Sequence, residues 1–407
     1  KKLKLSTLEL QSLRIKKTVS LETVKLPGLN NSVLENNTIL KDFYVDDMLC
    51  SVDSESEAIE HIKSVVEICS KGGFNLTQIS SNSPRVLASI NSTSLSILRK
   101  EQMMSKDKDV EERALGVIWK LQTDEFGFKI EKSAQATTKR GVLSMIFSIF
   151  DPFGFVGPVL LEGKSIFQQL CRLKIEWDAQ IPEEIANQWH AWINDLHLLS
   201  NYRIQRSIKP TEFSESKCEL HVFGDASQIG YGAVAYARFE NNSGNVHCSI
   251  LLAKTRLAPL KKVTIPKLEL AAAHLCVIVR NIIEREMNLS FDHHWYWTDS
   301  MVVLQCLRND TKRFQRYAAN RLGFIREHSE PAQWHHVPSQ LNPADCASRG
   351  STISRFMNDK TWKNGPHFLW QSPLVLPEQN KNSSELPKKT VGHRSKKYVV
   401  CSNKNKP

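Results

Sequence analysis

The stretch Cys218–Arg238, CELHVFGDASQIGYGAVAYAR, constrains the fold of this 407-residue chain more than any other. Alternating apolar residues lead to Asp225, and a second alternating run follows the glycines Gly230 and Gly232. The pattern predicts two strands of a hairpin, with a carboxylate projecting from the end of the first. Aspartate is disfavoured inside strands, so Asp225 needs a reason. This stretch alone leaves two open: a turn-forming Asp beside Ser227, or a functional carboxylate.

Three more carboxylates stand downstream at the ends of expected elements. Glu269 lies in the first turn of the helix that we expect after Pro266, beside an apolar stripe with helical spacing. Asp299 ends the aromatic strand His293–Trp297, at the kind of strand end where α/β proteins place their sites. Asp345 falls in the first turn of another expected helix.

Each of these three residues also has a purely structural interpretation. Glu269 would complement a helix dipole. Asp299 would cap the helix that follows it, although Ser300 can do the same. Asp345 occupies a capping-box position, but that position normally carries Glu or Gln, so local structure explains it only in part.

Taken together, the order strand-Asp, helix-Glu, strand-end-Asp, helix-start-Asp resembles the ribonuclease H domain of retroelements, with GDAS, KLEL, TDS and NPADCASR as the four motifs. The resemblance implies a mixed five-stranded sheet with flanking helices, the first three strands antiparallel. It also implies hydrolysis of the RNA strand of an RNA–DNA hybrid. The catalytic and metal-binding residues carried over are Asp225, Glu269, Asp299 and Asp345, with Asp225 contacting both ions.

The implied cofactor is a pair of Mg²⁺ ions, for which Mn²⁺ can substitute. Hard cations prefer oxygen ligands, which four carboxylates supply. Two such ions about 4 Å apart activate water and stabilise a leaving oxygen in phosphodiester hydrolysis. Without a cation, clustered carboxylates would repel one another and raise each other's pKa values.

A second carboxylate motif lies near the N-terminus, in DFYVDDMLCSV. It predicts a strand–turn–strand hairpin with Asp46 and Asp47 at its tip, a pair suited to magnesium. A helix should then begin at a capping box formed by Ser54 and Glu57 and end at Gly72.

This region resembles the palm of a retroelement reverse transcriptase, through YVDD, the helix and GGF, and ALGVIWKLQTDEFGFKI resembles the hairpin that follows the palm. Thr138–Leu170, with DPFGFVGPVLLEGKSIFQQL, resembles the corresponding region of Pao/BEL-class LTR retrotransposons. A polymerase palm holds its metals with aspartates from two separate strands. No apolar strand carrying an Asp precedes Asp46, so we expect no independent polymerase activity.

The expected fold class is α/β (α+β). A partial palm and a helical connection precede the ribonuclease H-like mixed five-stranded sheet with its flanking helices. We expect the following organisation: an undetermined leader at 1–40, the end of a reverse transcriptase palm at 41–135, a thumb- or connection-like helical region at 136–215, the ribonuclease H-like domain at 216–350, and a linker toward a missing integrase with a basic tail at 351–407.

The net charge of +11 and the pI of about 9.1 favour a polyanionic partner, although a basic solvated surface fits as well. The expected helix Phe314–Glu327 offers a basic face, for which Arg313, Arg316 and Arg321 are the candidate nucleic-acid contacts. No stretch is apolar enough to span a membrane, so no membrane partner is expected. The nine cysteines contain no C-x-x-C pair of the kind that holds a structural zinc. Their odd number and scattered, mostly apolar positions suggest a reducing compartment.

The leading hypothesis is therefore a retroelement pol fragment that cleaves RNA–DNA hybrids, with the integrase and protease parts absent from the chain. Its expected location is the cytoplasm, in a virus-like particle, or the nucleus. The alternative is a catalytically dead or co-opted remnant that binds nucleic acid or serves as a structural partner, including pairing with a second copy.

Overall fold

The chain divides into two compact units, residues 1–127 and 128–407. The computed structural model describes residues 43–44, 47–48, 50–52, 54–73, 76, 79–91, 111–114, 117–130, 137–287, 289–309, 311 and 313–377. Over these residues no helix is both long and apolar enough to cross a membrane.

The first unit contains the expected strand–turn–strand hairpin and the helix after it. Its elements are β1 (Phe43–Tyr44), β2 (Asp47–Met48), α3 (Glu55–Lys71), α4 (Pro84–Asn91), β3 (Glu111–Ala114), β4 (Val117–Lys120) and β5 (Glu125–Gly127). β1 and β2 are antiparallel, with Tyr44 opposite Asp47. The Ser54 hydroxyl accepts a hydrogen bond from the Glu57 amide and caps α3, as predicted. β3, β4 and β5 form an antiparallel meander.

The second unit begins with a bundle of three helices. Its elements up to the large sheet are α5 (Lys139–Ser148), α6 (Gly157–Arg172), α7 (Glu183–Leu196), η5 (His197–Asn201), β6 (Arg203–Gln205) and η6 (Thr211–Phe213). α6 packs between α5 and α7. The Trp192 indole donates a hydrogen bond to the Val159 carbonyl oxygen at 3.1 Å, and a Cβ on Gly163 would lie 2.9 Å from the Trp192 ring. The glycine therefore allows this close helix contact.

A five-stranded mixed sheet follows, in the order β11-β10-β7-β8-β9. Its strands are β7 (Ser216–Ala226), β8 (Gly230–Asn241), β9 (Val246–Leu257), β10 (His293–Thr298) and β11 (Trp334–His336). β7, β8 and β9 are antiparallel neighbours, whereas β10 runs parallel to both β7 and β11. The expected sheet, with its first three strands antiparallel, is confirmed.

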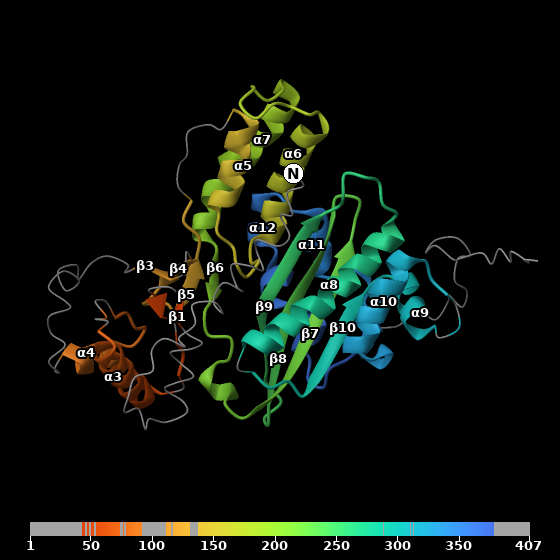
Figure 1. Cartoon of the computed structure of the whole chain (residues 1–407). Coiled ribbons are helices and arrows are strands. Elements are labelled where there is room, and N and C mark those ends of the chain that lie inside the picture. Colours follow the sequence, from red (N-terminus) through yellow and green to blue (C-terminus); the bar gives the residue numbers. More distant parts are fainter. Residues whose placement is uncertain are drawn as a thin grey trace, which may run out of the picture. The chain divides into compact units, whose positions relative to one another are not determined.

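Helices flank this sheet. They are α8 (Ile265–Glu286), α9 (Met301–Arg308), α10 (Arg316–His328), η7 (Pro331–Gln333), η8 (Ser339–Leu341), α11 (Ala344–Arg349), α12 (Ile353–Asn358), α13 (Lys360–Asn364) and η9 (His367–Trp370). Figure 1 shows α8, α9 and α10 together on one side of the sheet.

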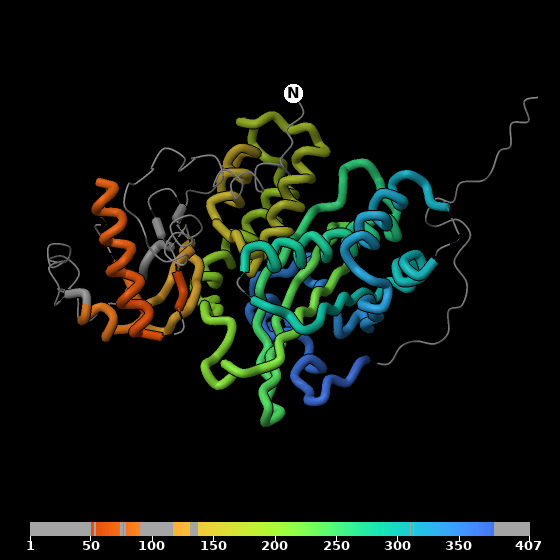
Figure 2. The backbone as a smooth tube through the Cα atoms, turned by 60° about the horizontal axis from the view of Figure 1, so that its bottom comes forward, coloured from red at the N-terminus to blue at the C-terminus, as the bar shows by residue number. Residues whose placement is uncertain are grey.

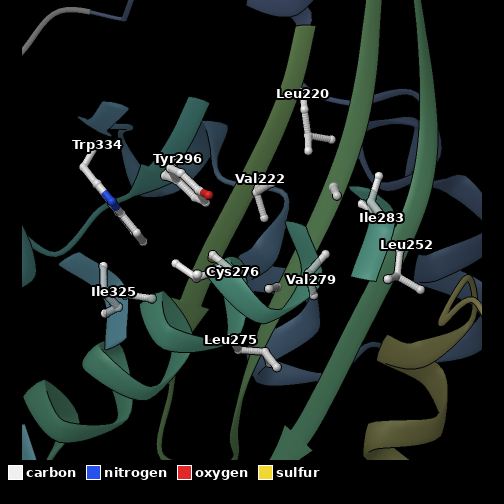
Figure 3. Packing of buried hydrophobic residues seen from close by; sticks show 14 of the residues in the cluster. Leu220, Val222, Leu252, Leu275, Cys276, Val279, Ile283, Tyr296, Ile325 and Trp334 are labelled. Atoms are coloured by element: carbon white, nitrogen blue, oxygen red, sulfur yellow. The ribbon is translucent and has the colours of Figure 1, made fainter. Parts of the chain in front are cut away.

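The pleat of β7 divides its side chains between two cores. Leu220 and Val222 point toward α8 and are fully buried against residues such as Cys276 and Val279 (Figure 3). A Cβ on Gly224, the next residue of this set, would lie 2.5 Å from the Cys276 sulfur. α8 thus lies close to the end of β7 that carries the candidate site.

The opposite face of the sheet is covered by α11 and by the segment that follows it (Figure 2). Trp362 is 0% exposed, and its indole donates a hydrogen bond to the Phe155 carbonyl oxygen at 2.8 Å. Phe368 packs against Phe223 and Trp297. The sequence suggested a linker from residue 351 onward, but up to η9 the segment forms part of the core, because its aromatic side chains fill this face.

A buried charge cluster fixes the end of that segment. Arg238 is 1% exposed and lies opposite Glu219 in the ladder, with its Nη1 2.9 Å from the Glu219 carboxylate. The same guanidinium donates to the carbonyl oxygens of Leu369, at 2.8 Å, and Gln371, at 2.7 Å. Burial opposes ionisation of Glu219, but His221, Arg238 and Lys217 outweigh it and lower its pKa to about 2.

The bundle and the sheet belong to one compact unit, although the sequence suggested a boundary at 215. β9 is an edge strand, and its Ala253 amide donates to the Phe153 carbonyl oxygen at 2.8 Å. The Asp151 carboxylate accepts from the amides of Phe155 and Val156 at the start of α6, at 2.8 and 2.9 Å. α6 then packs against β9 and α11.

We expect Arg238→Met to lower the free energy of unfolding by about 3–5 kcal/mol, because it leaves Glu219 buried without its counter-ion. Urea unfolding at neutral pH measures this. Arg285→Met, which removes an exposed pair with Glu286, is the matched control and should change stability by less than about 0.5 kcal/mol. Because the folded-state pKa of Glu219 is lowered, its contribution is present above about pH 4.5 and is lost as the pH falls toward 2. Equal stability of the two variants would contradict the assigned role of Arg238.

Trp362→Ala should destabilise the protein by about 3–5 kcal/mol, since it empties a fully buried aromatic site. The control is Trp370→Ala, at a residue of the same type and segment that is 41% exposed. Its loss should cost no more than about 1.5 kcal/mol, the scale of its one hydrogen bond to Asn364. If residues 351–370 were a linker, thermal melting would find both substitutions neutral.

Candidate active site

Asp225 lies one residue before the end of β7, on the face opposite α8. Strand alternation places it on the side of α11, and its ladder partner is Gly232. A Cβ at residue 232 would lie 2.5 Å from the Cβ of Ala347, so glycine there allows α11 to approach the sheet. That approach brings residues of α11 to Asp225, whose carboxylate accepts a hydrogen bond from the Ser348 hydroxyl.

The Asp225 carboxyl group is 5% exposed and stands in a negative environment. Burial, with the negative charges of Asp299 and Asp345, raises its pKa to about 7, although the Ser348 hydrogen bond acts in the opposite direction. Asp299 and Asp345 therefore both lie close enough to Asp225 to repel its negative charge.

Asp299 follows β10 directly. Thr298 pairs with Gly224 in the parallel ladder, so Asp299 and Asp225 continue adjacent strands in the same register. The Asp299 carboxylate accepts from the Ser339 hydroxyl at 2.6 Å. Ser300, and not Asp299, is the N-cap of α9, so capping does not explain Asp299.

Glu269 is the fifth residue of α8, because that helix begins at Ile265. The sequence predicted a position in the first turn, but Glu269 lies beyond it. This weakens the helix-dipole interpretation. The Ser300 hydroxyl donates to its carboxylate at 2.7 Å. Burial and the charge of Asp299 raise the pKa of Glu269 against the effect of this hydrogen bond.

Asp345 lies in the first turn of α11, as predicted. Its carboxylate is 2.5 Å from the Nε of Arg349, one helical turn further on. The Asn342 side chain accepts from the Ala344 amide at 3.1 Å and donates to the Gly224 carbonyl oxygen at 3.2 Å. Asn342 thus anchors the start of α11 to β7 beside Asp225.

Four partners of the carboxylates were not identified as site residues from the sequence: Ser300, Ser339, Ser348 and Arg349. Helical spacing is a usable signal for two of them, because Ser348 and Arg349 follow Asp345 by three and four positions. Ser339 carries no such signal, since it reaches Asp299 from a separate loop.

In chemical type, the four carboxylates match the oxygen ligands that Mg²⁺ prefers. In the part of the chain that the structure describes, however, no three Asp, Glu, His or Cys groups lie close enough to hold a metal ion together. Each of the four carboxylates instead contacts a protein donor. The negative charges of Asp299 and Asp345 still act on Asp225, the most buried of the four, and raise its pKa.

The second predicted metal motif is only partly described. Asp47 lies in β2, but its side chain and the whole of Asp46 fall outside the described residues. The assignment of Asp46 and Asp47 to a metal site therefore stays a prediction.

The predicted basic helix corresponds to α10. The Arg321 guanidinium stacks on the Tyr317 ring, with its Cζ 3.7 Å from the ring centroid, and the Tyr317 hydroxyl donates to the Lys267 carbonyl oxygen at 3.2 Å. Lys267 belongs to the same turn of α8 as Glu269. Arg313 and Arg316 are exposed.

The neighbourhood of Arg321 is strongly positive. His274 on α8 has its pKa lowered to about 4, first by burial and then by the positive charges of Arg321, Arg256 and His328. We call Arg256, Lys267, Tyr317 and Arg321 the basic patch. Among the described residues, no carboxylate forms an ion pair with its three cations.

Comparison with solved structures finds ribonucleases H. RNase H1 from the halophilic archaeon Halobacterium salinarum is 16% identical, with 32% of this chain and 93% of that chain covered and a TM-score of 0.23. LC11-RNase H1 in complex with an RNA/DNA hybrid is 13% identical, with 34% and 99% covered and a TM-score of 0.25. Prototype foamy virus protease-reverse transcriptase is 14% identical, with 57% and 28% covered and a TM-score of 0.23.

No curated protein matches the chain. Residues 138–300, which include Asp225, Glu269 and Asp299, match the family described as "Pao retrotransposon-like RNaseH-like domain". The match begins in the helical bundle and continues into the five-stranded sheet. The expected relation to Pao/BEL retrotransposons is thereby confirmed over residues 138–300 of the chain.

Proposed function

We propose that the second unit is a ribonuclease H, which hydrolyses the RNA strand of RNA–DNA hybrids with Mg²⁺ or Mn²⁺ as cofactor. The observation that carries the proposal is the register of β7 and β10, which places Asp225 and Asp299 side by side at one end of the sheet, with Asp345 on the helix whose Ser348 bonds to Asp225. Glu269 joins them through Ser300, the neighbour of Asp299.

In this proposal the four carboxylates would hold two divalent cations. When bound, such ions activate water and stabilise the leaving 3′ oxygen of a phosphodiester. Asp225 would be the central ligand, because it is the most buried of the four and continues the central strand. The hydroxyls of Ser348, Ser300 and Ser339 would hold one oxygen of Asp225, Glu269 and Asp299 respectively, and so orient the other.

The basic patch would bind the phosphate backbone of the substrate. Cations that lack an acidic partner attract polyanions, and phosphate contacts supply most of the non-specific affinity for nucleic acids. Lys267 and Glu269 both lie near the start of α8, so a strand bound at the basic patch would run past the same end of that helix as the carboxylates. The exposed Arg313 and Arg316 would extend the same surface.

One observation favours a second candidate function, nucleic-acid binding without cleavage. It is the lack, among the described side chains, of three groups at metal-binding distance. In that case the carboxylates would be a remnant, and the basic patch would carry the function alone. Hybrid cleavage separates the two candidates.

Asp225→Asn should abolish Mg²⁺-dependent cleavage of a hybrid labelled on its RNA strand. A loss of more than about 100-fold is expected, since changes to residues that only support a metal ligand already cost 10–100-fold. The fold should survive, because the amide is nearly isosteric and removes a repelled negative charge from a buried position.

The control is Asp178→Asn, which breaks an exposed ion pair with Arg140 in the same unit. It should cleave at the wild-type rate, and both variants should melt as single cooperative units. If Asp225→Asn cleaves normally, the assigned site is wrong. If the wild-type protein binds hybrid but never cleaves it, the second candidate stands.

Arg321→Gln should weaken hybrid binding. The slope of the logarithm of the association constant against the logarithm of salt concentration should become shallower by about 1, as expected for the loss of one phosphate contact. Fluorescence anisotropy in EDTA measures this without cleavage. Arg285→Gln is the control, because Arg285 is an exposed α8 arginine already paired with Glu286. If both variants keep the wild-type salt slope, the basic patch does not contact phosphate.

A further inference from the structure

Arg349 places a positive charge among the candidate metal ligands. It is the last residue of α11, and its Nε lies 2.5 Å from the carboxylate of Asp345, one turn earlier in the helix. The pair is partly open to solvent, because the Arg349 side chain is 62% exposed and that of Asp345 33%.

The influence of Arg349 extends beyond this one partner. The pKa of the guanidinium is raised by its hydrogen bond to Asp345 and by the charge of Asp345, and then by the charges of Asp225 and Asp299. Arg349 therefore stands in the combined electrostatic field of Asp345, Asp225 and Asp299. A divalent cation would be drawn to the same field.

Arg349 differs in kind from the other three donors at the site. Ser348, Ser300 and Ser339 are neutral. A carboxylate that accepts a hydrogen bond from a hydroxyl on one oxygen can still offer its other oxygen to a cation. A guanidinium carries a full charge that cannot be removed, so a second cation at the same carboxylate is repelled.

We propose that Arg349 is a built-in counter-ion, which holds Asp345 in the metal-free protein and competes with Mg²⁺ for that carboxylate. This rests on the proposed function, in which Asp345 is a metal ligand. Metal loading at Asp345 then requires release of Arg349. The released guanidinium is exposed beside the site, where it can donate paired hydrogen bonds to a phosphate group of the substrate. By linkage, bound hybrid would raise Mg²⁺ affinity by giving Arg349 a new partner.

A purely structural role gives a different expectation. An ion pair four residues apart stabilises a helix by a few tenths of a kcal/mol. If that were all, removing Arg349 would lower the melting temperature slightly and leave Mg²⁺ affinity unchanged. Mg²⁺ affinity is therefore the decisive measurement.

The test is a Mg²⁺ titration of the full chain, followed by thermal melting and by calorimetry, without substrate. Arg349→Met should lower the half-saturating Mg²⁺ concentration by about two- to five-fold, the equivalent of one partly exposed ion pair. Arg349→Lys keeps the cation and should stay near wild type. Arg355→Met removes an arginine of the neighbouring helix α12 and is the matched control, expected to match wild type.

A second Mg²⁺ titration, in the presence of a DNA duplex that the protein cannot cleave, measures how far bound nucleic acid raises Mg²⁺ affinity. The duplex should raise Mg²⁺ affinity more in the wild-type protein than in Arg349→Met. A wild-type or weaker Mg²⁺ midpoint in Arg349→Met overturns the counter-ion role while leaving the metal site in place. The absence of any Mg²⁺ effect on the wild-type protein overturns the metal site itself, and the inference with it.

Discussion

The arrangement of the second unit depends on the pleat of its central strand. Successive residues of β7 alternate between a face packed on α8 and a face packed on α11 and the segment after it. Leu220, Val222 and Gly224 belong to the first face; Glu219, His221, Phe223 and Asp225 belong to the second. A shift of one residue would exchange the two sets and bury the carboxylates against α8. The register of one strand therefore specifies both the apolar core and the position of the candidate site.

The face that carries Asp225 also carries the buried Glu219–Arg238 pair. A buried charge is costly unless it is fully paired, and Arg238 meets this condition by bonding to Glu219, Glu240 and two backbone carbonyls of the terminal segment. Trp297 and Phe223 stack on each other between this pair and the end of the sheet where Asp225 and Asp299 lie. The covering segment thus has polar contacts at one end and aromatic contacts in the middle, which set its course across the sheet.

Local patterns in the sequence were sufficient to predict the strands of the sheet and helix α8. They also singled out the four carboxylates, whose role as a catalytic site stays a prediction. Strand alternation, helical spacing and the small residues around Asp225 are properties of residues close together in the chain, so the sequence alone reveals them. The hydrogen bond from Trp362 to the Phe155 carbonyl oxygen and the packing of Phe368 on Trp297 join residues far apart in the chain, so no local pattern indicated them. For the same reason Ser339 was missed as a partner of Asp299, and residues 351–370 suggested a linker.

The contact between the bundle and β9 explains why bundle and sheet form one body. β9 is the outer strand of the sheet, and an open outer strand invites pairing with other chains. Phe153 accepts a backbone hydrogen bond from Ala253, and the Lys254 ammonium reaches the Pro152 carbonyl oxygen, so the turn before α6 covers part of that edge. A Cβ on Gly154 would lie 2.0 Å from the Ala253 carbonyl oxygen, and its φ of 76° also favours glycine. Because α6 also packs against α11, which carries Asp345, the bundle supports one side of the candidate site as well as the sheet edge.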